Sequence, residues 1–357
     1  MSNSIYFYKD RPLFGLDLGF SSVKVMQLAQ KNKDHYEVAG YGVASFDPKF
    51  IHKGEVVDFE GIAAPIKEMF ENSLVGSITT RRVVFSVPAA YTFSRVITLP
   101  KEIEKKDMAD AVTTETQQYI PTPIEELYTD YSVIAYDKTE TRILTVAVSR
   151  KIIDSYMKLA EMLNLEVVAM EPTTGATNRL FGYTDHHKVP TVLIDFGSIT
   201  TDITIYDKNL VVTGTIAGGG DQYTDAIRKA LNVTQEEAHT IKTKYGLNVS
   251  KRQKEIRAAI KPYMEELSKE IRRMIRYYEE RANDEHKKIG QVATLGGGAN
   301  VPGLSDYLTE LLRLPVRSCD PWSHLVFKDI PQPAPDEKSL YITAAGLGLV
   351  SPEEPLS

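Results

Sequence analysis

The fold is decided by the stretch Gly15-Leu-Asp17-Leu-Gly19-Phe-Ser21-Ser22-Val-Lys24, whose pattern returns at Ile194-Asp195-Phe-Gly197-Ser198-Ile-Thr200-Thr201-Asp202. In both copies an apolar strand runs into Asp-x-Gly, a short polar turn follows, and an alternating strand leaves. Glycine lets a backbone approach a bound anion closely, and turn amides with Ser or Thr hydroxyls can surround phosphate oxygens. The Asp carboxylate suits a hydrated Mg²⁺. The repeat therefore predicts two hairpins that grip one nucleoside triphosphate from opposite sides.

The composition is that of an ordinary globular protein. The chain has 357 residues, 42% of them hydrophobic and 25% charged, which predicts two or more domains with buried cores. A net charge of −6 carries no electrostatic pattern for nucleic acid. Cys319 is the single cysteine, which excludes an intrachain disulfide and fits a reducing compartment.

The sequence predicts a cytoplasmic protein. No apolar run is long enough to span a bilayer, and residues 1–10 lack the pattern of a secretory signal peptide. Membrane attachment is therefore expected to come from a partner. The pair His186-His187 is expected on a surface turn rather than in a metal site, because no Cys or His stands at zinc-ligand spacing.

Several segments have clear helix or strand patterns. Helices are predicted at 101–119, at 152–163, and at 234–246, where Thr234 and Glu237 form a capping box. A long helix is predicted at 262–282, with Pro262 in its first turn. Two strands at 128–135 and 142–148 are expected to pair. Residues 87–165 are therefore predicted to form a compact αβ subdomain inserted into the first half of the chain.

Four strand-to-loop elements stand in a fixed order: the Asp17 hairpin, the Asp195 hairpin, Gly218–Gly220 and Gly296–Gly298. A glycine run after a strand and before a helix lets backbone pass close to a phosphate or a flat ligand. In this order the elements resemble the actin-like ATPase superfamily. The stretch Met170-Glu171-Pro172-Thr173 is similar to the first connecting helix of its chaperone members, and residues 344–348 are similar to the second.

The resemblance implies an α/β actin-like ATPase fold, with two duplicated core domains facing a nucleotide cleft, and binding of ATP with Mg²⁺. It implies that Glu171 helps to place the attacking water, and that Asp17 and Asp195 hold the metal through water. The alternative for Glu171 is that it only caps the connecting helix. The residues expected to bind the nucleotide are Asp17, Gly19, Ser21, Ser22, Lys24, Gly197, Ser198, Thr200, Gly218, Gly219, Gly220, Lys242, Gly296, Gly297 and Gly298.

Three positions qualify this site. Lys24 can reach a phosphate as a point charge, or it can be a solvated side chain on the outgoing strand. Ile199 stands where the chaperones have glycine, and His239 stands where the division-protein branch has Glu three residues before its lysine, here Lys242. Both departures make nucleotide binding more expected than fast hydrolysis.

The inserted region resembles one branch of the superfamily, the PilM family of type IV pilus assembly, which is related to FtsA and to the L-type proteins of type II secretion. The resemblance rests on Leu99-Pro100, Tyr119-Ile120-Pro121 and Asp130-Tyr131. It implies a 1C-type subdomain and a groove that accepts the cytoplasmic tail of PilN, an inner-membrane protein. The expected parts are core domain I at 12–86 and 166–190, the insertion at 87–165, core domain II at 191–232 and 291–338, a 2B subdomain at 233–290, and a connecting helix with the tail at 339–357.

The leading hypothesis is an ATP-binding cytoplasmic scaffold recruited to the inner membrane by a PilN-like protein, with slow or absent hydrolysis. Pilus motor ATPases and a second copy of the chain are further candidate partners. The main competing hypothesis is an FtsA-like membrane filament protein, although the acidic tail 351–357 lacks the basic amphipathic helix of that branch. A sugar or acetate kinase and a pseudo-ATPase also stay open.

Overall fold

The computed structural model describes residues 12–32, 35–104, 106–136, 139–184, 189–281, 288–335 and 337–350. The expectations for residues 1–10, for His186-His187 and for the tail 351–357 lie outside these ranges. The described residues form two compact units. Within the described ranges, the first unit takes in residues 12–180, 324–331 and 343–350, and the second takes in 181–323 and 332–342.

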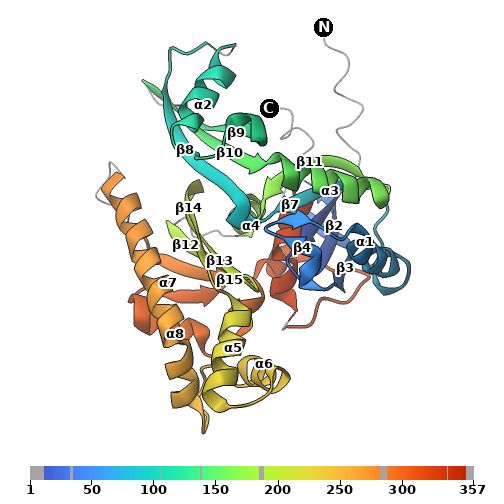
Figure 1. Cartoon of the computed structure of the whole chain (residues 1–357), viewed down its shortest axis with the longest axis vertical. Helices are drawn as coiled ribbons and strands as arrows, with labels where there is room; N and C mark the ends of the chain where they lie inside the picture. The colour runs from blue at the N-terminus through green and yellow to red at the C-terminus, as the bar shows by residue number, and fades with distance from the viewer. Residues whose placement is uncertain are drawn as a thin grey trace. The chain divides into compact units, whose positions relative to one another are not determined.

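The first unit is built on a seven-stranded mixed sheet (Figure 1). Its order is β11 (Glu166–Pro172), β7 (Arg82–Val87), β1 (Phe14–Leu18), β2 (Ser22–Asn32), β3 (His35–Ser45) and β17 (Leu325–Val326), with β6 (Val75–Gly76) also paired to β3. Strands β11, β7 and β1 run parallel, whereas β1–β2 is an antiparallel hairpin. A short ladder of β4 (Ile51–His52) and β5 (Glu55–Val56) follows β3.

Helices cover both faces of this sheet, because β1 and β7 are apolar on both sides. Phe14 and Phe85 point into a core with α1 (Phe59–Glu68) and α3 (Arg150–Met162). Val84, the neighbour of Phe85, points to the opposite side, where α4 (Thr173–Thr184) and α9 (Ile342–Gly348) pack. A Cβ atom at Gly15 would overlap the Ala344 carbonyl oxygen, so glycine lets β1 and α9 touch through their backbones.

The inserted region forms a separate three-stranded sheet in the order β8 (Thr92–Pro100), β10 (Glu140–Ser149), β9 (Leu127–Tyr136). One face of the sheet packs on α2 (Met108–Gln117) through Ile97, Val112 and Ile143. The predicted pairing of 128–135 with 142–148 is confirmed. The prediction of a helix from 101 is wrong: residues 101–102 form a turn and 103 a bend, and α2 begins only at Met108, because the charges of 101–104 leave only Ile103 to pack on this small core.

The second unit has a five-stranded sheet in the order β14 (Asn209–Ala217), β13 (Thr200–Asp207), β12 (Thr191–Phe196), β15 (Gln291–Leu295), β16 (Val316–Ser318). Its core is formed with α5 (Gly220–Leu231), α6 (Gln235–Lys244), α7 (Gln253–Arg281) and α8 (Leu304–Leu312). The predicted capping box of Thr234 and Glu237 is confirmed: Glu237 N–H donates to Thr234 Oγ1, and Thr234 N–H donates to the Glu237 carboxylate.

Helix α7 starts earlier than predicted. It begins at Gln253, so Pro262 lies inside the helix instead of in its first turn. The buried stripe of α7 runs through the proline, from Ile256 and Ile260 to Met264, and this packing outweighs the backbone hydrogen bond that the proline removes. None of the helices in the described ranges combines the length and the apolar character needed to cross a membrane.

Candidate functional site

The first Asp-x-Gly turn joins β1 to β2. Gly19 N–H donates to the Ser22 carbonyl oxygen at 3.0 Å, which closes the turn. Asp17 is 8% exposed and lies across the hairpin from Lys24. Lys24 Nζ is 3.6 Å from Asp17 Oδ2, and its side chain is 13% exposed. Lys24 is therefore paired with Asp17 and is not a solvated side chain.

Ser86 supports this turn from the neighbouring strand and was not singled out from the sequence. Its hydroxyl donates to Asp17 Oδ1 at 2.8 Å and accepts from the Leu18 amide at 3.1 Å. Ser86 also lies in register with Glu171 on β11. Asp17, Ser86 and Glu171 thus stand near the carboxyl ends of three adjacent parallel strands, where α/β sheets commonly bind ligands. The sequence signal was a polar residue near the end of a buried strand.

A buried tyrosine lies near the same carboxylate. The Tyr156 hydroxyl on α3 is fully buried and makes no hydrogen bond within the described part of the chain. Burial raises the pKa of this phenol, and the negative charge of Asp17 raises it further. Tyr156 therefore stays neutral.

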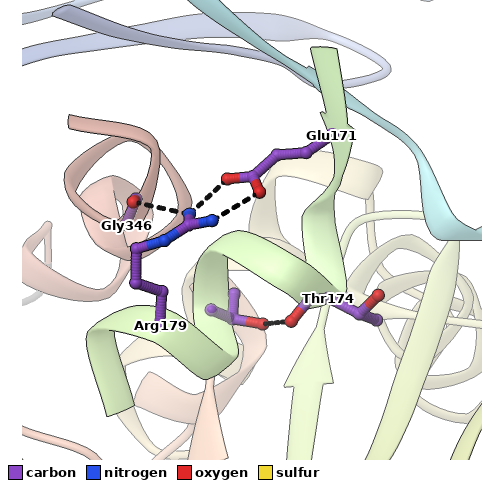
Figure 2. Close-up of polar contacts among 5 residues, drawn as sticks. Glu171, Thr174, Arg179 and Gly346 are labelled. Carbon is purple, nitrogen blue, oxygen red and sulfur yellow. Dashed lines mark hydrogen bonds and ion pairs between the residues drawn. The ribbon is translucent and has the colours of Figure 1, made fainter. Parts of the chain in front are cut away.

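Glu171 is held by an arginine (Figure 2). Arg179, on α4, donates from Nη1 to Oε1 at 2.5 Å and from Nη2 to Oε2 at 2.8 Å. Arg179 Nη1 also donates to the Gly346 carbonyl oxygen of α9 at 3.2 Å. The side chains of Arg179 and Glu171 are only 25% and 18% exposed. This two-pronged, partly buried arrangement is the strong form of an ion pair.

The second Asp-x-Gly turn joins β12 to β13 with the same hydrogen bond as the first. Gly197 N–H donates to the Thr200 carbonyl oxygen at 3.0 Å. The residue across the hairpin differs, because Asp195 pairs with Asp202 where Asp17 pairs with Lys24. Asp202 accepts from the Thr215 hydroxyl at 2.6 Å. The two turns therefore have the same backbone hydrogen bond. The residue beside the first carboxylate is a positive lysine in the first turn and a negative aspartate in the second.

The glycine loop before α5 is bonded to the second turn. Gly220 N–H donates to the Gly197 carbonyl oxygen, and Asp221 N–H donates to that of Ser198, both at 2.9 Å. A Cβ atom at residue 219 would overlap the Gly197 carbonyl oxygen. Glycine at 219 thus lets loop and turn pack backbone to backbone. Ile199, at the tip of the turn, is 42% exposed.

The glycine run after β15 lies against the same turn. Gly296 has φ +77° and ψ 172°, a conformation open mainly to glycine, and a Cβ atom there would overlap Asp195 Oδ1. A Cβ atom at Gly298 would stand 2.6 Å from Phe196 Cβ. The second unit therefore gathers Asp195, Gly197, the 218–220 loop and the 296–298 loop.

Lys242 completes this cluster. Its Nζ donates to the Gly220 carbonyl oxygen at 2.8 Å, and the residue is 7% exposed. Burial lowers the pKa of the Lys242 ammonium, and Asp221 partly offsets that shift. Lys242 also helps to line a small apolar cavity, whose wall is made by Tyr223, Ile227, Lys242, Gly246, Leu247, Ile256, Ile260, Met264, Val301 and Leu304. His239, one helical turn earlier, is exposed.

The predicted residues fall into one group per unit. In the first unit Asp17, Gly19 and Lys24 lie together, with Ser21 and Ser22 half-buried in the turn. Over the ranges that the structure describes, no three His, Cys, Asp or Glu side chains gather as metal ligands. The partly buried carboxylates fit a hydrated Mg²⁺, because that ion keeps most of its waters and needs only one or two carboxylates.

A protein-family comparison supplies the wider context. The model for "Type IV pilus assembly protein PilM" matches residues 15–351. The cell division protein FtsA of Streptococcus pneumoniae is 25% identical over an alignment of 264 residues, and the match covers 65% of this chain and 55% of FtsA. The chain therefore spans about half the length of that relative.

Solved structures show the fold. A PilM–PilN type IV pilus biogenesis complex matches with a TM-score of 0.81 and 20% identity, covering 95% of this chain and 98% of the other. EutJ from Carboxydothermus hydrogenoformans matches at 0.58 with 17% identity, covering 95% and 89%. MreB5 of Spiroplasma citri bound to ADP matches at 0.53 with 15% identity, covering 95% of each chain. The expected actin-like ATPase fold is thus confirmed.

Proposed function

Because this chain belongs to the PilM family of type IV pilus assembly proteins, we propose that it is an ATP-binding scaffold of pilus assembly. The observation that carries this proposal is that the same turn occurs twice. In each Asp-x-Gly motif the glycine N–H, of Gly19 or Gly197, donates at 3.0 Å to the carbonyl oxygen of the third residue after it. The ADP bound to the structurally similar MreB5 gives further support.

The proposed roles follow the two groups of residues. Phosphate contacts are assigned to Gly19, Ser21, Ser22, Lys24, Gly197, Ser198 and Thr200. The carboxylates of Asp17 and Asp195 would accept hydrogen bonds from the water ligands of Mg²⁺. The ion would offset the negative charge of the phosphates. The nucleoside is assigned to Lys242, Gly218–Gly220 and Gly296–Gly298. Ser86 holds Asp17 in place, which adds a supporting residue to the predicted set.

We propose that hydrolysis is slow or absent. A residue that positions an attacking water must be able to turn toward it, and the Glu171 carboxylate is held in one orientation by two hydrogen bonds from Arg179. Asp202 beside Asp195 adds a second negative charge near the phosphate loop of the second unit. The protein is thus better suited to hold a nucleotide than to turn it over.

The proposed partner is the cytoplasmic tail of a PilN-like inner-membrane protein, which would recruit this chain to the inner face of the membrane. The supporting surface is the face of the β8–β10–β9 sheet opposite α2. Val96 and Leu144 are in register there and only partly buried, whereas Val146, next on the same face, packs against the core of the first unit. Such a partly covered apolar face fits an extended peptide. Pilus motor ATPases and a second copy of the chain are further proposed partners.

Calorimetry tests nucleotide binding. Mg·ATP is titrated into the wild type, Asp17→Ala and Asp110→Ala, the last being an exposed carboxylate of α2. We expect binding heat for the wild type and for Asp110→Ala, and at least about a tenfold weaker affinity for Asp17→Ala, because a carboxylate that orients the hydrated metal is lost. Equal heats for all three would remove Asp17 from the site.

Fluorescence anisotropy tests the partner. A labelled peptide of the cytoplasmic N-terminus of the PilN-like protein is titrated with the wild type, Leu144→Asp and Thr114→Asp. Thr114 is exposed on α2, which covers the other face of the sheet, so its variant carries the same added charge away from the surface. We expect only Leu144→Asp to weaken binding. Equal weakening by both would indicate a general effect of charge or folding.

A second candidate function has its own observation. The 25% identity with the cell division protein FtsA favours the competing hypothesis, an FtsA-like membrane-associated filament protein. ATP-dependent pelleting of the pure protein on anionic lipid vesicles would favour that function over the scaffold.

A further inference from the structure

The contact between Glu171 and Arg179 is a bidentate ion pair that fixes the orientation of the carboxylate. Both carboxylate oxygens are engaged, at 2.5 and 2.8 Å, by the two terminal nitrogens of one guanidinium. Glu171 lies near the end of β11 and Arg179 lies in the second turn of α4, so strand and helix are tied at their junction. Figure 2 shows the guanidinium lying between Glu171 and Gly346.

A carboxylate held in this way is oriented toward the guanidinium. To act on water it must accept a proton on one of the bonded oxygens. If Glu171 took up the proton while still bonded to Arg179, the three-quarters buried guanidinium would lie beside a neutral acid. An unpaired buried charge is unfavourable. Glu171 must therefore move away from Arg179 before it can act. An arginine stays charged at all ordinary pH, so titration cannot release the pair.

Arg179 has a second anchor that resists such movement. Its Nη1 donates to the Gly346 carbonyl oxygen, near the carboxyl end of α9, where a cation is also favoured by the helix dipole. A Cβ atom at Gly346 would overlap the Ala176 carbonyl oxygen, so α9 and α4 are in backbone contact at this point. The guanidinium is thus fixed by a carbonyl that does not depend on Glu171.

We propose that Arg179 is a positioning residue that holds Glu171 inactive, and that its removal turns a slow ATPase into a faster one. This inference rests on the proposed binding of ATP. With Arg179 in place the protein retains the bound triphosphate. When Glu171 is released, it takes a proton from water, the water oxygen bonds to the γ-phosphorus, and the bond from that phosphorus to the β,γ-bridging oxygen breaks, giving ADP and inorganic phosphate.

Four variants separate this role from a structural one: Arg179→Met, Arg179→Lys, Glu171→Gln and the double variant Glu171→Gln/Arg179→Met. Arg252→Met is the matched control, because Arg252 also pairs with a glutamate but is exposed. For each, ATP affinity is measured by calorimetry and phosphate release by a coupled assay. Hydrogen exchange of residues 342–350 without nucleotide reports the α9 anchor independently of activity.

The expected results are specific. Arg179→Met keeps the ATP affinity of the wild type and releases phosphate at least about tenfold faster, a gain that one general base can supply. Its backbone amides in residues 342–350 also exchange hydrogen faster than those of the wild type. Arg179→Lys gives a smaller gain, because a lysine cannot bond both oxygens. The double variant loses the gain, and Arg252→Met equals the wild type.

Three results would overturn the inference in distinguishable ways. If Arg179→Met binds ATP but hydrolyses it no faster, the ion pair is only structural, while the proposed nucleotide binding stands. If neither the wild type nor any variant binds ATP, both proposals fall. If Arg179→Met and Arg179→Lys both fail to fold, the pair serves stability, and the inference is likewise rejected.

Discussion

Gly296 shows how one residue can be required by its backbone and its neighbour together. Its φ of +77° with ψ of 172° lies in a region that is essentially restricted to glycine, and a side chain would overlap Asp195 Oδ1. We predict that Gly296→Ala lowers the free energy of unfolding by about 2 kcal/mol, the order expected for such strain. Urea unfolding followed by circular dichroism measures this change.

The adjacent glycine is the control. Gly297 is exposed, has no positive φ, and a Cβ atom there would meet only Leu340 Cδ2 at 3.2 Å, a flexible side-chain end. Gly297→Ala is therefore expected to stay within about 0.5 kcal/mol of the wild type. Equal losses for the two variants would refute the conformational argument at 296.

Lys242 makes a prediction about pH. Burial lowers the pKa of its ammonium from the ordinary 10.5, so the unfolded chain binds this proton more tightly than the folded one. The cost of burying the charge is complete below the folded pKa and vanishes as pH rises toward 10.5. We predict that Lys242→Met is more stable than the wild type at pH 7 by roughly 1 kcal/mol.

This gain should shrink between pH 7 and about 10, and ATP binding should weaken in the same variant. Thermal unfolding across that range tests the first expectation, with Lys244→Met, an exposed lysine of the same helix, as the reference. A pH-independent gain would mean that Met packs better in the cavity for reasons unrelated to charge.

At the scale of the element, α6 depends on its capping box. Thr234→Ala removes the acceptor for Glu237 N–H, and we predict a loss of about 1 kcal/mol in the free energy of unfolding. The hydrogen bonds from Thr234 lower the pKa of Glu237 below its ordinary 4.5. Their contribution is therefore complete above pH 4.5 and disappears as the pH falls below that value.

The measurement is chemical denaturation at pH 7 and pH 3. Thr240→Ala is the control, because Thr240 is exposed on the same helix and caps nothing with its side chain in the described structure. A loss for Thr234→Ala that is as large at pH 3 as at pH 7 would show that the Thr234 side chain adds nothing to the Glu237 carboxylate, because the Thr234 N–H that donates to that carboxylate is kept in the variant.

Elements differ in how well the sequence predicted them. The capping box and the two turns were predicted because their hydrogen bonds join residues at most three positions apart. The start of α7 was missed because a local rule, proline at the first turn, was overruled by the packing of Ile256 and Ile260 in the core. A stripe of buried residues that continues upstream of Pro262 was the available signal.

The candidate site shows the same division. Each glycine loop alone was weak evidence, and the fixed order of the four elements gave the resemblance that predicted one site. Ser86 and Arg179 were not predicted, because their contacts depend on strand order and on how α4 folds back on β11. A charge partner eight residues away across a strand-to-helix junction has no periodic signature in sequence. Such partners decide whether a recognised residue such as Glu171 can act.

At the scale of the whole molecule, the proposal implies that nucleotide and partner influence each other. If Mg·ATP changes the affinity for the PilN-like peptide by some factor, the peptide must change the affinity for Mg·ATP by the same factor, because linkage is reciprocal. We predict a factor of at least about five, the lower end of typical couplings. Anisotropy with and without Mg·ATP, and calorimetry with and without saturating peptide, measure the two values.

Leu144→Asp makes this test sharper, because it removes the peptide but not the turns that are proposed to bind nucleotide. Its ATP affinity should equal that of the free wild type and should no longer respond to peptide. A factor of one in the wild type would mean that the two ligands bind independently, so the protein would be a passive adaptor. Unequal factors in the two directions would reveal a further bound state, such as a second copy of the chain, because two ligands and one protomer must satisfy reciprocity.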